Sequence, residues 1–366
     1  MQFRTWAIAT LLAGCGSSSN NPLPDSATAP ADAPIDAPNA TPWTAPTGAL
    51  LDGVTLADGW TDLRVASPAL VIDGGWTDSL FATPDGKSLL IAYSQVDFST
   101  FFISSGASAP LTGPMLAGTQ PTTFKIFEAD LGASDWAISA HPIDAFVGTT
   151  TVASPATNES GDLMIFSEFD SSGHSQLFYS QKASGAWSAP AAAFTSACND
   201  DNAKIVGELA SSVTIYFESN RGSDDGTNTT CGQRTLYTTT YSAATGMFSP
   251  VAKVPGIAIA GSDDTQPFLT HDGTTLIWSG VRGTYAVYSA TKSGATFGNI
   301  HAIATPTATA PVVGKVVLLG EPSIVTVPEG ELLYMMCGVA SNVGNAMTYH
   351  DADHIQLVPC VARRPA

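Results

Sequence analysis

The stretch "DDTQPFLTHDGTTLIWSGVRGTYAVYSATKSG", residues 263–294, decides the fold. Its Asp272-Gly273 step favours a tight hairpin turn, because glycine tolerates a positive φ. The runs 275–281 and 285–290 on the far side of this turn are short, apolar and rich in aromatic and β-branched residues, as strands are. The stretch therefore predicts a meander of antiparallel strands.

The same pattern recurs along the chain. Each copy has a central apolar strand: "SLLIAYS" (88–94), "DLMIFSE" (162–168), "VTIYFES" (213–219), "TLIWSGV" (275–281) and "ELLYMMC" (331–337). A second strand follows each one, and most copies end in a further turn and a short last strand. Four-stranded units repeated at this period are typical of β-propeller blades, which bury both faces of each sheet by stacking around an axis.

The sequence thus predicts an all-β chain folded as a five-bladed propeller of four-stranded antiparallel blades. The blades are expected at residues 75–143, 144–192, 199–255, 260–304 and 317–360. The segment 54–70, with Trp60 where other repeats carry an outer-strand Trp, is expected to complete the fifth blade. An unpaired extension or a partial sixth blade remain as alternatives.

The repeat resembles the WD40-like blade of TolB-type propellers. The resemblance rests on 263–294, on "VTIYFESNRGSDDG" (213–226) and on "SLFATPDGKSLLIAYS" (79–94), and it covers most of residues 75–340. It implies the propeller fold. It does not imply an activity, because propellers of this type serve as scaffolds, peptide binders and enzyme platforms.

The N-terminus "MQFRTWAIATLLAGC" has a basic residue, a short apolar run and small residues before Cys15, as export signals do. It resembles the lipobox of bacterial lipoproteins, which implies cleavage after residue 14, lipidation of Cys15 and, with Gly16 next, an outer-membrane location. Residues 15–46 are rich in Pro, Ala and Ser and predict a disordered tether. The propeller domain is expected to occupy residues 47–366.

The formal net charge of −18 argues against a nucleic-acid partner. If Cys15 is lipidated, the remaining four cysteines of this exported chain suggest two disulfides. Three pairings are open, and Cys198–Cys231 with Cys337–Cys360 are the most local.

The start of each inner strand is where side chains converge on a propeller axis. The repeats place Asp78, Asp201, Asp264 and Glu321 there, and the second blade offers Thr150 or Thr151. Such a ring of acids would line a ligand funnel or hold a cation such as Ca²⁺, although no cofactor is required. The plainer alternative is that these acids hydrogen-bond backbone groups of the neighbouring blade.

Two further clusters could bind metal. One is the pair His350 and His354 with Asp351 and Asp353 between them, and the other is Asp224, Asp225 and Asn228. A polar turn and a plain surface loop are the alternatives. No phosphate-binding loop and no nucleophile elbow occurs in the sequence.

The sequence therefore predicts an envelope lipoprotein whose propeller binds or scaffolds an envelope protein or glycan, anchored to the membrane through Cys15. The alternative function is a glycoside hydrolase that uses the axial carboxylates Asp78, Asp201, Asp264 and Glu321. A purely structural envelope protein is the third possibility.

Overall fold

A computed structural model describes residues 48–72, 76–94, 96–97, 109–110, 116, 123–143, 151–170, 172–222, 231–307, 314–341 and 354–366. The signal sequence, Cys15, the tether, Thr150 and the two further candidate metal clusters lie outside this part of the chain, except for the backbone of His354. None of the described residues forms a helix that is long and apolar enough to cross a membrane.

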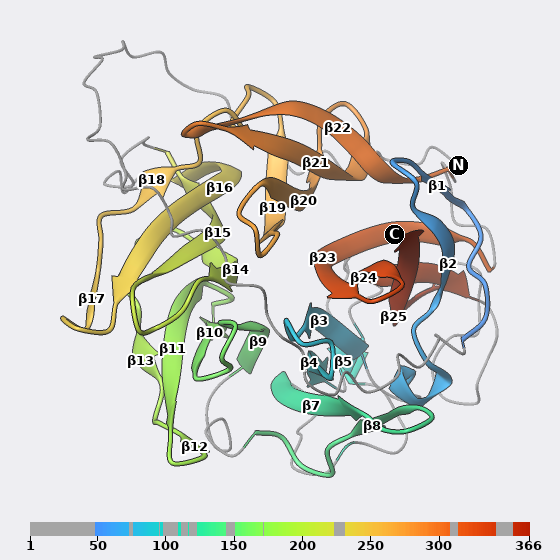
Figure 1. Cartoon of the computed structure of the whole chain (residues 1–366), viewed down its shortest axis with the longest axis horizontal. Coiled ribbons are helices and arrows are strands. Elements are labelled where there is room, and N and C mark those ends of the chain that lie inside the picture. Colours follow the sequence, from blue (N-terminus) through green and yellow to red (C-terminus); the bar gives the residue numbers. More distant parts are fainter. Residues whose placement is uncertain are drawn as a thin grey trace. The chain divides into compact units, whose positions relative to one another are not determined.

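The five predicted repeats are five antiparallel sheets, which follow one another in chain order (Figure 1). Blade 1 contains β3 (Trp76–Ala82), β4 (Ser88–Ser94), β7 (Lys125–Leu131) and β8 (Trp136–Ile138). Blade 2 contains β9 (Thr151–Thr157), β10 (Leu163–Phe169), β11 (Ser175–Ala183), β12 (Ala186–Trp187) and β13 (Ala191–Ala192). Blade 3 contains β14 (Asp200–Val206), β15 (Val213–Arg221), β16 (Cys231–Ser242), β17 (Met247–Phe248) and β18 (Ala252–Lys253).

Blades 4 and 5 each combine strands from both ends of the chain. Blade 4 contains β19 (Asp263–Leu269), β20 (Thr275–Val281), β21 (Tyr285–Ser293), β22 (Thr296–Pro306) and the N-terminal β1 (Val54–Leu56). Blade 5 contains β23 (Val316–Val327), β24 (Gly330–Ser341), β25 (His354–Pro365) and the N-terminal β2 (Thr61–Val65). A two-stranded ribbon, β5 (Val96–Asp97) and β6 (Ala109–Pro110), and a short 3-10 helix at Pro68–Leu70 complete the described elements.

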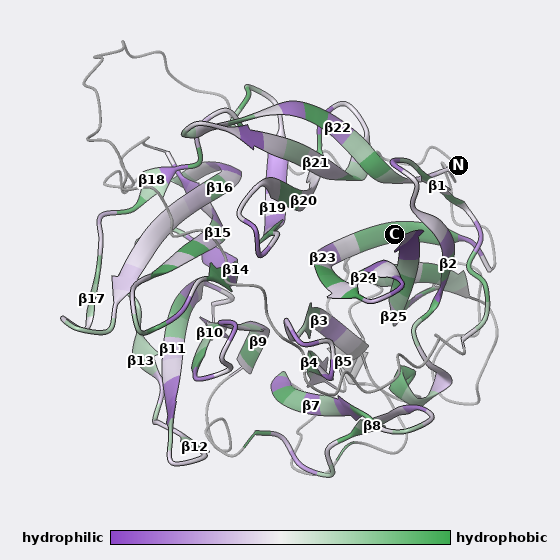
Figure 2. Cartoon of the chain, in the orientation of Figure 1, coloured by the Kyte–Doolittle hydropathy of each residue, from purple (hydrophilic) through white to green (hydrophobic). Residues whose placement is uncertain are grey.

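The sheets close into a ring through their inner strands. β3 contacts β9, β9 contacts β14, β14 contacts β19, β19 contacts β23, and β23 contacts β3. The all-β, five-bladed architecture predicted from the repeats is therefore confirmed. Because every blade has a neighbour on both faces, the apolar side chains on both faces of each sheet are covered, and hydrophobic segments run along strands such as β10 and β23 (Figure 2).

The predicted outer strand of blade 5 is also confirmed, since β2 pairs with β25. Its Trp60 and Leu63 are both buried, each only 4% exposed. An unpaired extension and a sixth blade are both excluded by this pairing. The sequence did not predict that β1 would add a fifth strand to blade 4 by pairing with β22.

The Asp-Gly turns form as the sequence predicts, and a threonine supports two of them. In blade 4, Gly273 has a φ of +68°, and the Oγ1 of Thr270 donates to Asp272 and accepts from the backbone N–H of Thr275. In blade 1, Thr83 bonds in the same way to Asp85 and to the N–H of Ser88. The short side chain that precedes each turn therefore closes the hairpin as much as the Asp-Gly step does.

Both disulfides have the local pairing that the spacing favoured. Cys198–Cys231 joins the segment before β14 to the start of β16, and Cys337–Cys360 joins β24 to β25. Each bridge therefore lies within one blade, and neither holds two blades together.

Candidate functional site

All five inner strands share an irregularity near their middle. Each has a register shift there and places a non-glycine residue in the left-handed region, with φ between 51° and 57°: Ser79, Ser154, Asn202, Gln266 and Glu321. This backbone conformation costs on the order of 1 kcal/mol or more for a residue with a side chain. Its repetition in every blade indicates that the strain accompanies a role at these positions or next to them.

Four of these residues link neighbouring blades, and in blade 3 the link is made by Asp201, the residue before Asn202. A series of hydrogen bonds, here called the axial belt, joins each blade to the next around the whole ring. The five links are Ser79 Oγ to Ser154 Oγ (3.3 Å), Ser167 Oγ to Asp201, Gln266 N to Glu218 Oε2 (2.8 Å), Glu321 N to Gln266 Oε1 (3.1 Å) and Leu80 N to Glu321 Oε2 (2.7 Å). At the bulges, backbone N–H groups are free of the pairing within the sheet. Three of these N–H groups donate instead to side chains of the neighbouring blade.

The structure brings together three of the four acids that the sequence placed at the axis. Asp78 and Glu321 each interact electrostatically with Asp201, and Asp78 also acts on Glu321. Glu321 is 2% exposed, whereas Asp78 and Asp201 are half-buried. Glu321 accepts from the backbone N–H of Leu80 in the adjacent blade, which is the plainer role that the sequence left open, whereas Asp201 accepts from the side-chain hydroxyl of Ser167.

Asp264 is the exception, and the prediction from the repeats that it lies at the axis was wrong. Its carboxylate is fully buried inside blade 4 and accepts hydrogen bonds from Trp278 Nε1 (2.8 Å), Arg282 Nε (2.8 Å) and Ser262 Oγ (2.8 Å). The bulge of blade 4 falls at Thr265 and Gln266, one residue farther along the chain than the comparison of the repeats had placed it. Since successive side chains of a strand point to opposite faces, this shift turns Asp264 away from the belt.

The axial residue of the second blade also differs from the one that the sequence predicted. Its bulge position is occupied by Ser154, where the sequence analysis offered Thr150 or Thr151. Thr151 lies earlier in β9, opposite Phe169. The small hydroxyl of Ser154 therefore takes the place that an acid, an amide or a hydroxyl occupies in the other blades.

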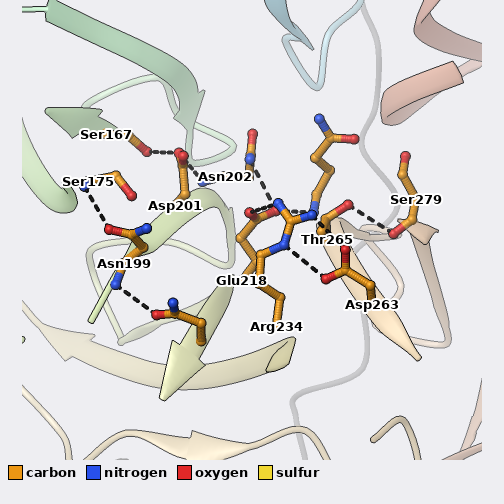
Figure 3. Close-up of polar contacts among 12 residues, drawn as sticks. Ser167, Ser175, Asn199, Asp201, Asn202, Glu218, Arg234, Asp263, Thr265 and Ser279 are labelled. Carbon is orange, nitrogen blue, oxygen red and sulfur yellow. Dashed lines mark hydrogen bonds and ion pairs between the residues drawn. The ribbon is translucent and has the colours of Figure 1, made fainter. Parts of the chain in front are cut away.

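Three charged residues of blade 3 belong to the site and were not predicted. Glu218 accepts from Asn202 Nδ2 (3.1 Å) and lies 3.5 Å from Arg234 Nη1, and Arg234 also binds both oxygens of Asp263 (Figure 3). Lys204 extends from β14 until its Nζ lies 5.2 Å from the ring centroid of Phe81 in blade 1. Glu218 and Arg234 lie on the second and third strands of their blade. The prediction from the sequence covered only residues at the start of each inner strand, so it could not find them.

Burial is the main cause of the unusual acidity in this cluster. It raises the pKa of Asp78 to about 6, that of Glu218 to about 7 and that of Glu321 to about 8, and neighbouring carboxylates add to each effect. Burial also raises the pKa of Asp201 and lowers that of Lys204. The belt therefore holds carboxyl groups that remain protonated, in part, at neutral pH.

Three groups of the cluster have unused hydrogen-bonding capacity. Among the described residues, the carboxyl group of Asp78 accepts a hydrogen bond only from the backbone N–H of Ser79. Within the same part of the chain, the buried Oδ1 of Asn202 and the buried Nζ of Lys204 have no hydrogen-bond partner. Asp78 and Asn202 offer acceptors and Lys204 offers a donor, so the cluster suits a molecule that both donates and accepts hydrogen bonds.

A calcium ion is not supported by this geometry. No three His, Cys, Asp or Glu side chains in the described ranges lie together in a way that could hold a metal. The ammonium group of Lys204, which acts on both Asp201 and Glu321, also disfavours a second cation among these acids.

The raised pKa values predict that the protein becomes less stable as the pH rises through neutrality. Unfolded glutamate releases its proton near pH 4.5, whereas folded Glu321 holds it until about pH 8. Between these values the folded state binds more protons, so stability falls with pH by roughly 1.4 kcal/mol per unit for each retained proton. Lys204, whose pKa is lowered, acts in the opposite direction, so a variant is needed to isolate the carboxyl group.

Glu321→Gln supplies that variant, because glutamine mimics the protonated acid and still accepts from the N–H of Leu80. We expect urea denaturation to show similar stability for the variant and the wild type at pH 5.5, and greater stability for the variant at pH 8.5. The exposed Glu329→Gln is the control and should follow the wild type. Parallel pH profiles for Glu321→Gln and the wild type would contradict the prediction.

Comparison with known proteins assigns no family. No protein-family profile and no curated protein matches the chain. Solved structures that are similar include TolB from Acinetobacter baumannii (18% identity, TM-score 0.38, covering 78% of this chain and 54% of TolB) and a thermostable family-43 glycoside hydrolase (12%, 0.48, covering 78% and 94%). A Dyadobacter fermentans protein of unknown function is another (8%, 0.47, covering 85% and 99%). The chain thus spans about half the length of the TolB structure, and likeness at this level carries no argument about activity.

Proposed function

We propose that the chain is an exported, lipid-anchored binding module of the bacterial cell envelope. In this proposal Cys15 holds the protein to the membrane, residues 15–46 form the tether, and the propeller presents its axial site to an envelope protein or glycan. The observation that carries the binding role is the half-buried carboxyl group of Asp78, which the belt leaves without a partner from another blade. The two disulfides are consistent with an oxidising compartment outside the cytoplasm.

The unused groups indicate the chemistry of the ligand. Asp78 and the Oδ1 of Asn202 are acceptors and the Nζ of Lys204 is a donor, so the ligand should both donate and accept hydrogen bonds, as the hydroxyl groups of a glycan or of protein side chains do. An anionic ligand is disfavoured by the surplus of carboxylates and by the overall charge of −18.

Binding is favoured over hydrolysis because a glycosidase needs two carboxyl groups that face the scissile bond. Asp201 and Glu321 are already engaged, the first with Ser167 and the second with the N–H of Leu80. One observation still favours hydrolysis as a second candidate. The pKa of Asp78, at about 6, suits a general acid, and the charge of Asp201 contributes to it.

The test is the substitution Asp78→Asn in the full mature chain. We expect wild-type protein to retain a ligand from a panel of envelope polysaccharides or from a solubilised outer-membrane fraction, and Asp78→Asn to bind it at least tenfold more weakly. Asp272→Asn, in the equivalent exposed hairpin turn of blade 4, is the matched control and should bind normally.

The same panel separates the two candidate functions. Release of new reducing ends by the wild type, lost in Asp78→Asn, would replace the binding role with hydrolysis. Equal binding by wild type and Asp78→Asn would remove Asp78 from the site.

A further inference from the structure

A cavity lies away from the axial belt, between blades 1 and 2. It has a volume of about 210 Å³ and is bordered by the β3–β4 turn at Asp85, by Glu128 of β7, and by Thr157, Lys182 and Trp187 of blade 2. Thr157 is the last residue of β9, whereas Ser154 of the belt is its central residue, three positions earlier. Strands rise about 3.3 Å per residue, so the cavity, here called the interblade cleft, is separate from the axial site.

The cleft contains a buried polar group with nothing to bind. Thr157 is 4% exposed, and its Oγ1 has no hydrogen-bond partner in the described part of the chain. Leaving a buried hydroxyl without a partner costs roughly 1–3 kcal/mol. Valine would fill the same space without that cost, so a threonine at this position points to an occupant that exchanges a hydrogen bond with it.

The walls of the cleft combine an aromatic ring with carboxylates. Trp187 is half-buried, and the Nζ of Lys182 lies 5.3 Å from its ring centroid. On the blade 1 side, Asp85 uses one carboxylate oxygen for Thr83 and for the N–H of Lys87, and its other oxygen remains available. The side-chain carboxylate of Glu128, also on this side, makes no hydrogen bond or ion pair with any other described residue.

This set of groups selects among ligand classes. Carboxylates accept hydrogen bonds from hydroxyl groups, and an aromatic face covers the C–H groups of a sugar ring. A phosphate would meet Asp85 and Glu128 with only Lys182 to balance them, and a metal lacks three suitable ligands among the described residues. Ligand pockets for larger molecules measure roughly 300–1,000 Å³, so this cleft suits a single sugar residue.

We propose that the interblade cleft binds one neutral pyranose residue, by stacking on Trp187 and by hydrogen bonds to Thr157, Asp85 and Glu128. The inference is independent of the axial function proposed above, since it uses none of the belt residues.

The experiment uses the full mature chain and saturation-transfer NMR with five probes: the methyl glycosides of glucose, mannose, galactose, xylose and N-acetylglucosamine. At least one should bind with a Kd in the millimolar range. Thr157→Val and Trp187→Ala should each weaken that binding at least fivefold. Thr235→Val is the matched control, because Thr235 is also buried and its Oγ1 also lacks a partner among the described residues, but it does not line the cleft.

Each possible result of this binding experiment either supports or contradicts the proposed sugar site. Binding that is lost in Thr157→Val and Trp187→Ala but kept in Asp78→Asn and Thr235→Val supports the cleft. Binding that is lost only in Asp78→Asn belongs to the axis and overturns the inference. Absence of binding to all five glycosides by the wild type overturns it as well, whatever the axial site does.

Discussion

Replacing Asp264 with alanine is expected to destabilise the protein by about 3–5 kcal/mol, because it leaves a buried cation without its counter-charge. The Arg282 side chain is 7% exposed and binds both oxygens of Asp264, at 2.8 and 3.0 Å. The indole N–H of Trp278, a fully buried side chain, loses its acceptor at the same time. Urea denaturation followed by far-UV circular dichroism measures the loss as a lower midpoint.

Asp58→Ala is the control for this experiment. Asp58 forms its ion pair with His301 at the surface, where both side chains are more than a third exposed, so its removal should change the midpoint little. Ligand binding by folded Asp264→Ala should equal that of the wild type. If the variant keeps its stability but loses binding, Asp264 belongs to the axial site, as the sequence predicted.

Removing the N-terminal strands is expected to have the second large effect. A chain that begins at Ser67 lacks β1 and β2, and with them the buried side chains of Trp60 and Leu63. It also exposes the edges of β22 and β25 with which these strands pair. Burial of two such side chains contributes about 3–6 kcal/mol, so thermal unfolding should begin at a clearly lower temperature and lose cooperativity.

A chain that begins at Gly48 is the matched control, since the described pairing starts at the Leu50–Arg64 bridge. It should unfold at the wild-type temperature. If the chain that begins at Ser67 unfolds at that temperature too, closure of the ring by the N-terminal strands does not stabilise the propeller.

Much of the fold could be predicted from the sequence because its signals are local. The Asp272-Gly273 turn and the alternating strands around it depend on residues close in the chain, and so do both disulfide pairings. The pairing of β2 with β25 joins the two ends of the chain, yet it followed from counting strands, because the fifth repeat lacked a last one.

The site was less predictable, because it depends on the exact register of each inner strand. The bulges carry Ser, Asn, Gln or Glu at positive φ, and none carries the glycine that would mark such a position. Asp78 precedes Asp85 of its turn by seven residues, whereas Asp264 precedes Asp272 by eight. That difference is the sequence signal that separates the axial acid from the one buried inside its blade.

Glu218 had no such signal. It lies within the apolar strand "VTIYFES", and only the packing of blade 3 against blade 4 brings it to the N–H of Gln266. The same holds for Lys204, whose contact with Phe81 joins two blades that are not neighbours in the chain. Interactions between blades depend on the whole ring, so a single repeat does not specify them.

The axial belt has a consequence for how this protein can evolve. Propellers grow and shrink by copying whole blades, and identical blades could be exchanged without loss. Here the five links are of four chemical kinds: a hydroxyl pair, a hydroxyl with a carboxylate, a backbone amide with a glutamate (twice, at Glu218 and Glu321), and a backbone amide with a glutamine side chain. A duplicated or transposed blade would meet a neighbour that lacks the matching group. The belt therefore constrains both the number and the order of the blades, because one blade cannot replace another without losing a link.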